Sequence, residues 1–89
     1  MKGSISKDTK SRALHRLKIM EGQIRGLEKM VREEEYCIDI LHQSIAIQNS
    51  LKSLNAFILE NHLVTHLSKQ LKKNPNSAVK EMIKLYKVV

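Results

Sequence analysis

Apolar residues recur at spacings of three and four over the first third of the chain, which is the pattern of an amphipathic helix. The stripe consists of Leu14, Leu17, Met20, Ile24, Leu27 and Val31. Because Asp8 precedes this stripe and belongs to a residue type favoured at the N-cap, the pattern predicts a helix from about Asp8 to Glu34. The polar residues 1–7 predict a flexible arm in front of it.

A second helical pattern begins near Tyr36 and continues without Gly or Pro as far as Lys73, which predicts one unusually long helix. Its apolar residues are Ile38, Ile40, Leu41, Ile45, Ile47, Leu51, Leu54, Phe57, Ile58, Leu59, Leu63 and Leu67. A helix that is apolar over so much of its circumference must be covered on more than one side. Since the first helix covers one side only, we expect other subunits to cover the rest.

The segment KKNPNSA contains the only proline of the chain and separates the long helix from a short last one. Asn76 or Ser77 is the expected cap of this third helix, which carries Val79 and Met82 among its apolar residues. With three helices in 89 residues, the fold class is predicted to be all-α, with a single domain over residues 1–89. So short a chain buries only a marginal core by itself, which favours self-association.

Sixteen Lys and Arg against nine Asp and Glu give a formal charge of +7, which points to a polyanionic partner. No apolar run approaches the roughly 20 residues that cross a bilayer, so nucleic acid is expected rather than a membrane. No helix-turn-helix signature is evident. Because only three residues are aromatic, few side chains could stack on unpaired bases, so duplex DNA is favoured over single strands. The candidate DNA-binding residues are Arg12, Arg16, Lys18, Arg25 and Lys52, although such a charge run also occurs on an ordinary solvated face.

The first ten residues contain no apolar core of a secretory signal, and Cys37 is the single cysteine of the sequence. One cysteine forms no disulfide within the chain, as is usual in a reducing compartment. A cytoplasmic location is therefore expected. The sequence also lacks paired carboxylates, a nucleophile motif and a phosphate-binding loop, so no enzymatic activity is expected.

His62 and His66 are four residues apart within the long predicted helix, so that their rings project from one face. The pair alone is also compatible with two solvated or structural histidines. Cys37 adds a thiolate, and a set of one thiolate and two imidazoles suits Cu(I), Zn(II), Ni(II) or Co(II). A free cysteine is otherwise often just a small buried apolar residue.

Cys37 and His62 cannot meet within one continuous helix, because 25 residues at 1.5 Å each separate them by about 37 Å. Two copies of the helix packed antiparallel would place Cys37 of one chain beside His62 and His66 of the other. Two-fold symmetry then creates two equivalent sites per dimer. The sequence therefore predicts a metal site shared between subunits.

Three segments together resemble the CsoR/RcnR/FrmR family of metal- and aldehyde-responsive repressors. They are RLKIMEGQIRGLEKMV (16–31), YCIDILHQSIAIQ (36–48) and ENHLVTH (60–66), and the resemblance covers nearly the whole chain. It implies a three-helix protomer, an antiparallel dimer and a disc-like dimer of dimers, a homotetramer. It further implies a repressor that binds operator DNA when uninduced and releases the DNA when the inducer binds.

The resemblance also implies roles for individual residues by motif position. Cys37, His62 and His66 match the metal ligands of the family. Arg16 and Lys52 fall among its DNA-contacting basic positions. Tyr36 and Glu81 match a pair outside the ligand set that relays ligand binding.

Two departures from the family pattern bear on the inducer. Copper sensors of the family have a cysteine where His66 stands, which shifts the preference towards borderline metals without excluding Cu(I). Nickel and cobalt sensors have an additional N-terminal histidine at about the position of Ile5, which cannot ligate a metal. Two alternatives to metal sensing stay open: a formaldehyde-responsive repressor of the same family, and an architectural helical oligomer that binds duplex DNA without sensing metal.

Overall fold

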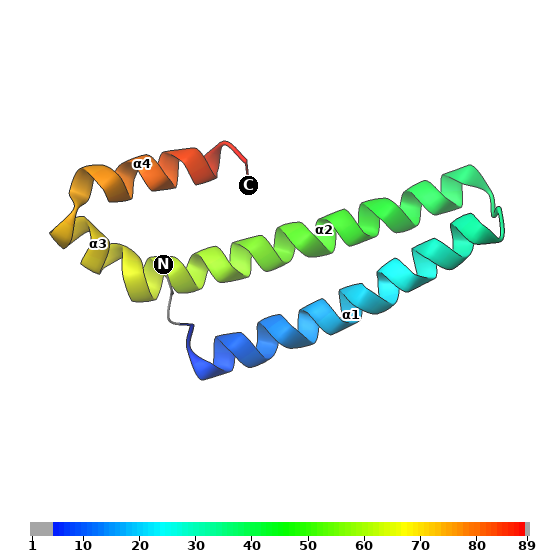
Figure 1. Ribbon diagram of the computed structural model, residues 1–89, viewed down its shortest axis with the longest axis horizontal. Coiled ribbons are helices and arrows are strands. Elements are labelled where there is room, and N and C mark those ends of the chain that lie inside the picture. Colours follow the sequence, from blue (N-terminus) through cyan, green and yellow to red (C-terminus); the bar gives the residue numbers. More distant parts are fainter. Residues whose placement is uncertain (1–4, 89) are drawn as a thin grey trace.

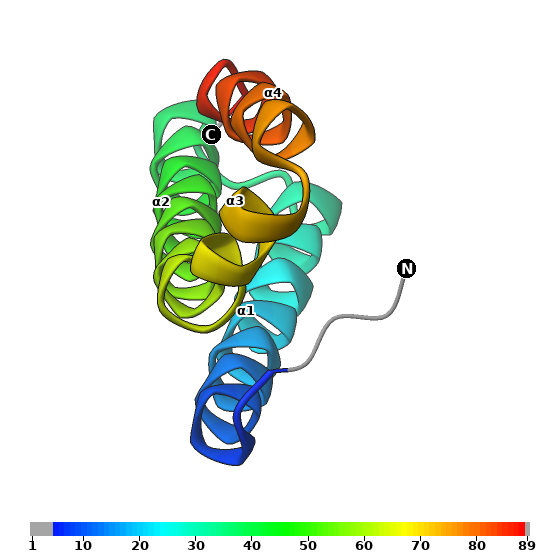
Figure 2. The same ribbon diagram turned by 90° about the vertical axis from the view of Figure 1, so that its left-hand side faces the viewer.

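The structure, a computed structural model, describes residues 5–88, which form helices joined by short turns. The elements are α1 (Lys7–Arg32), α2 (Cys37–His62), a π-helical segment η1 (Leu63–Leu67), α3 (Ser68–Lys73) and α4 (Pro75–Tyr86). Helices α1 and α2 form a long antiparallel hairpin, and α4 turns back along α2 on the side away from α1 (Figures 1 and 2). The predicted all-α class is thus confirmed.

Helix α1 begins earlier than the sequence pattern indicated. It starts at Lys7 and its N-cap is Ser6, so the predicted cap at Asp8 is wrong. Asp8 instead lies in the first turn, where a negative charge interacts favourably with the helix dipole. Of the arm predicted for residues 1–7, the last residue is already helical, and residues 1–4 lie outside the described part of the chain.

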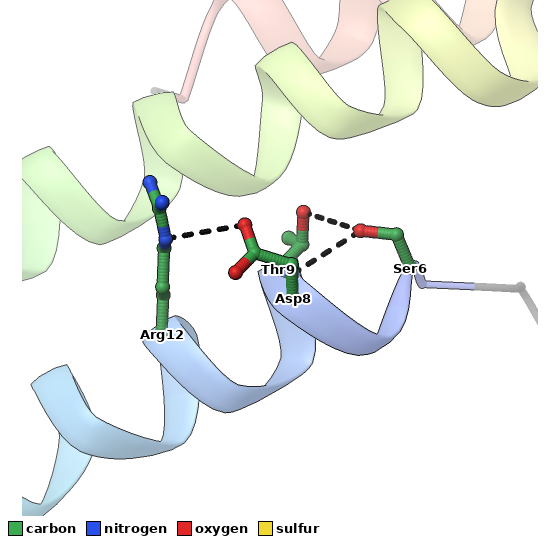
Figure 3. A network of polar contacts seen from close by, with 4 residues as sticks. All are labelled: Ser6, Asp8, Thr9 and Arg12. Atoms are coloured by element: carbon green, nitrogen blue, oxygen red, sulfur yellow. Dashed lines mark hydrogen bonds and ion pairs between the residues drawn. The ribbon is translucent and has the colours of Figure 1, made fainter.

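Polar contacts close the first turn of α1 (Figure 3). The Ser6 hydroxyl accepts a hydrogen bond from the Thr9 amide at 3.2 Å, which satisfies one of the free N–H groups of the helix start. It also donates to the Thr9 hydroxyl at 2.7 Å. One turn further on, Arg12 Nε lies 3.2 Å from an Asp8 carboxylate oxygen. Hydrogen bonds thus fix the helix start at Ser6, and an exposed ion pair follows it.

The turn between α1 and α2 is a Schellman motif. The Glu35 amide donates to the Met30 carbonyl at 3.0 Å, and the Glu34 amide donates to the Val31 carbonyl at 3.1 Å. Glu34 has φ 53°, the left-handed conformation that glycine usually supplies at this position. The helix therefore ends at Arg32, two residues before the predicted boundary.

The long helix predicted from about Tyr36 to Lys73 is helical from Cys37 to Lys73, but it is not one uniform α-helix. Five residues, Leu63–Leu67, form a π-helical segment. Within it, the Thr65 hydroxyl donates to the Asn61 carbonyl at 2.7 Å. Hydroxyl bonds of this kind compete with backbone bonds and distort helices. The widened turn lies where the two predicted histidine ligands are found.

The final helix begins at Pro75, directly after Asn74, whose φ of −141° breaks the preceding helix. Proline suits the first helical position because its missing N–H would have no partner there and its φ is already helical. Asn76 and Ser77, the predicted caps, lie inside the first turn instead, so that prediction is wrong. The break after Lys73 and the short last helix are confirmed.

Few side chains are buried within the single chain. The core cluster consists of Ala13, Met20 and Leu54 with Phe57 packed against it, while many large apolar residues of α1, α2 and α4 are exposed. The radius of gyration is 17.1 Å, whereas a compact chain of this length has about 12 Å. The chain is an open hairpin. Within residues 5–88 no helix is long and apolar enough to cross a membrane.

Candidate metal centre

The two predicted histidine ligands lie side by side at the end of α2. The ring centroids of His62 and His66 are 5.7 Å apart, and the ring planes are inclined at 39°. Both side chains are partly buried. His62 is the last residue of α2 and His66 belongs to η1, so the widened turn connects them. π-helical turns inside α-helices occur frequently at functional sites.

His62 has a ring nitrogen without a hydrogen-bond partner. Its Nε2 atom is buried and no donor or acceptor among the described residues reaches it. A buried polar atom of this kind costs free energy unless something binds it. The ring also lines an open hollow of about 380 Å³ between α2 and α4, together with Asn55, Leu59, Glu81 and Met82 among others. His62 thus lies at the edge of an open hollow, with its Nε2 atom buried.

Cys37, the predicted sulfur ligand, is exposed and lies at the opposite end of α2 from the histidines. Cys37 and His62 are the first and last residues of α2, so 25 steps of 1.5 Å separate them by about 37 Å. Among residues 5–88 no group of three or more His, Cys, Asp and Glu side chains is placed to hold a metal. One chain therefore brings two of the three predicted ligands together and leaves Cys37 apart from them.

The predicted relay residues are also far apart within one chain. Glu81 lies on α4 and lines the same hollow as His62. Tyr36 is the N-cap of α2, next to Cys37, and its side chain is exposed. A predicted relay residue thus lies beside each predicted ligand group: Tyr36 beside Cys37, and Glu81 of α4 on the hollow that His62 lines.

The predicted DNA-binding residues lie on the two helices of the hairpin. Arg12, Lys18, Arg25 and Lys52 are exposed. Arg16 is partly buried, because its guanidinium contacts α2: Nη1 donates to the Ser53 hydroxyl at 3.0 Å, and Cζ lies 4.7 Å from the centre of the Phe57 ring.

Sequence reasoning did not find the partners of Arg16 or the widened turn between the histidines. Ser53 and Phe57 are too far from Arg16 in the sequence for any periodicity to connect them. The widened turn had a weak local signal, since a threonine directly before His66 can bond the carbonyl four residues earlier. The sequence also could not show which residues of α4 line the hollow beside His62, because that depends on how α4 packs against α2.

Residues 9–88 match the family model described as metal-sensitive transcriptional repressor. The chain belongs to this family. It is 34% identical over 83 residues to the copper-sensing transcriptional repressor CsoR of Bacillus subtilis (strain 168), an alignment that covers 92% of this chain and 82% of that protein. It is 37% identical over 75 residues to CsoR of Mycobacterium tuberculosis (strain ATCC 25618 / H37Rv), covering 83% of this chain and 63% of that relative.

A solved structure shares the fold. The crystal structure of the copper-sensing repressor CsoR with Cu(I) from Geobacillus thermodenitrificans NG80-2 superimposes with a TM-score of 0.83 at 34% sequence identity. The match covers 98% of this chain and 91% of the other. The resemblance to the CsoR/RcnR/FrmR family is therefore confirmed. The protein is a metal-responsive transcriptional repressor, which acts by binding DNA, and it is not an enzyme.

Proposed function

We propose that the metal-free protein binds duplex operator DNA in the cytoplasm, and that Cu(I) bound between two subunits releases it. The ligands are Cys37 of one subunit and His62 with His66 of another. The observation that carries this proposal is the buried, unpartnered Nε2 of His62 with the His66 ring 5.7 Å away.

The donor atoms fit a transition metal. Neutral imidazole nitrogens and a thiolate are ligands that Cu(I), Zn(II), Ni(II) and Co(II) all accept. A metal at Nε2 of His62 would satisfy the atom that lacks a partner in the protein. Cys37 is exposed at the end of α2 and is therefore accessible to a second subunit.

The open shape of the protomer supports the shared site. Large apolar side chains along α2, such as Leu41, Ile45 and Leu51, are about half exposed, and such a surface normally lies in an interface. Antiparallel pairing of α2 with its copy would cover this surface and bring Cys37 of one subunit to the histidines of the other. The proposed homotetramer is a pair of such dimers joined through a second surface, because the two-fold α2 interface is already used within each dimer.

Cu(I) is the metal we favour. The named relatives are copper-sensing repressors, and the solved neighbour holds Cu(I). Two nitrogens and one sulfur suit borderline metals as well, so Zn(II), Ni(II) and Co(II) belong in the same experiment. For any metal to relieve repression, it must bind the DNA-free form more tightly than the DNA-bound form.

Operator release tests the proposal directly. A fluorescein-labelled duplex, selected by the metal-free protein from a random-sequence library, is titrated with protein in an anisotropy assay with and without each metal. Cu(I) is expected to weaken DNA binding by about 5- to 150-fold, the usual range of allosteric coupling. Unchanged affinity with all four metals overturns the proposal. Release by formaldehyde alone would identify an aldehyde-responsive repressor instead.

Variants separate the metal site from the DNA surface. Cys37→Ala should bind the duplex as tightly as the wild type and lose the Cu(I) response. His42→Ala is the matched control, because His42 is an exposed histidine on the same helix and is no predicted ligand. It should keep both properties. A full Cu(I) response in Cys37→Ala would show that Cys37 is not a ligand of the metal.

A further inference from the structure

Arg16 is anchored to the neighbouring helix at two points. Its guanidinium donates a hydrogen bond to the Ser53 hydroxyl at 3.0 Å and lies 4.7 Å from the centre of the Phe57 ring. Arg16 belongs to α1, whereas Ser53 and Phe57 belong to α2. The packing of the two helices therefore sets where this charge lies.

The Phe57 ring, over which the guanidinium lies, is partly buried. It packs against the core cluster of Ala13, Met20 and Leu54. Ala13 and Met20 stand three residues before and four residues after Arg16 on α1, so the ring lies at the helix interface beneath the arginine. An aromatic face attracts a guanidinium and leaves the N–H edges of the planar group free to bind other acceptors.

Space for a ligand exists beside the anchored guanidinium. Arg16 lines an open hollow of about 260 Å³ together with Ile19, Met20, Ser50 and Ser53. Ser53 accepts a hydrogen bond from only one of the guanidinium nitrogens, whereas the group has five N–H donors in all. A phosphate entering the hollow could accept from the others in the charge-assisted, bidentate manner that arginine favours.

We propose that Phe57 and Ser53 are positioning residues that hold the Arg16 guanidinium in the orientation in which it binds a DNA phosphate. This inference rests on the proposed function, since it takes Arg16 to lie on the DNA-binding surface. Fixing a long side chain before binding removes part of the entropic cost of forming the complex. Phe57 itself does not contact DNA in this arrangement.

Arg12 provides the matched comparison. It lies one turn before Arg16 on the same helix and pairs with Asp8 of its own helix, with 66% of its side chain exposed. It carries the same charge and is also a predicted DNA contact. If Phe57 acts on DNA binding only by positioning Arg16, replacing Phe57 should leave the contribution of Arg12 to the DNA affinity unchanged.

A double-mutant cycle on the metal-free protein tests the inference. The affinity for the selected duplex is measured by anisotropy for Phe57→Leu, Arg16→Ala, Arg12→Ala and the two double variants. Phe57→Leu is expected to weaken binding by about five-fold, the scale of one cation–π contact. The same change should have no further effect in Arg16→Ala and its full effect in Arg12→Ala.

Two further variants test whether weaker DNA binding comes only from a disturbed fold. Phe57→Tyr keeps the ring face and should bind DNA as the wild type does. Ser53→Ala alters an exposed side chain, so it should not disturb folding, and it should weaken binding about two-fold only when Arg16 is present. Circular dichroism and sedimentation velocity establish that each variant has the wild-type helicity and assembly.

The outcomes separate this inference from the proposed function. If Arg16→Ala weakens binding but Phe57→Leu weakens it equally in both arginine backgrounds, the positioning role is overturned and the proposed function stands. If Arg16→Ala leaves the affinity unchanged, Arg16 is not on the DNA surface and the positioning role fails with it. If Cu(I) does not release the DNA but the Arg16 and Phe57 variants behave as expected, the proposed function is contradicted and the positioning role stands.

Discussion

Cys37 and His62 are the first and last residues of one helix, α2, and about 37 Å separates them along its axis. A metal bound by both must therefore join two chains. This relationship connects the chemistry of the site to the assembly of the protein, and it makes the sharing of ligands directly testable.

Mixing two defective variants should restore metal binding. Cys37→Ala lacks the sulfur ligand, and the double variant His62→Ala, His66→Ala lacks both nitrogens. In an antiparallel mixed dimer, one of the two sites receives Cys37 from one chain and both histidines from the other, so it is complete. After unfolding and refolding the two variants together, titration with Cu(I) is expected to show one tight site per mixed dimer.

Each variant refolded alone is the control for this mixing experiment and should show no tight site. Recovery of binding cannot occur if every site draws all its ligands from one chain. A mixture that binds no more metal than its separate components would therefore contradict the shared site.

Removing the unpartnered nitrogen of His62 should stabilise the metal-free protein while abolishing its metal response. Leu has a similar volume and no polar atom, so His62→Leu relieves a buried polar group that costs about 1–3 kcal/mol. Because the whole side chain is only partly buried, we expect a gain of about 1 kcal/mol in the free energy of unfolding. Urea denaturation at fixed protein concentration measures it.

His42→Leu serves as the comparison for this prediction, because His42 is exposed on the same helix. It should change the free energy of unfolding by less than about 0.5 kcal/mol. A destabilised His62→Leu variant would mean that the imidazole is satisfied in the assembled protein without a metal.

Glycine at position 34 should stabilise the turn between α1 and α2. Glu34 has φ 53°, and a residue with a Cβ atom pays roughly 1–2 kcal/mol in this conformation. Glu34→Gly is therefore expected to raise the midpoint of chemical denaturation, by an amount equivalent to about 1 kcal/mol. Glu33→Gly, at the preceding position with φ −86°, should be neutral or destabilising. Equal effects at both positions would refute this account of the turn.

The thermal midpoint of unfolding should rise with protein concentration. Large apolar residues such as Leu41 and Ile45 are about half exposed in the single chain, so much of the stability is expected to come from association. For a protein whose subunits unfold as they separate, mass action makes the midpoint depend on concentration. Circular dichroism melts over a hundred-fold dilution series check this, and a constant midpoint would indicate that the protomer is stable alone.

Local patterns in the sequence determined the helices and indicated the candidate ligands. The spacing of apolar residues marked both long helices, and Pro75 marked the break before the last one, because φ restriction and side-chain periodicity act over a few residues. The same patterns misplaced the cap of α1 at Asp8, since the choice between neighbouring cap residues depends on which hydroxyl or carboxylate reaches a free amide.

Only the tertiary structure decided which of these residues have partners. The contact of Arg16 with Phe57 and the hollow that places Glu81 near His62 depend on how α1 and α4 pack against α2. The sequence alone determined that Cys37 and the histidines stand at opposite ends of a helix, because helical rise is constant. That Nε2 of His62 is buried without a partner required the fold, because burial is set by residues distant in the chain.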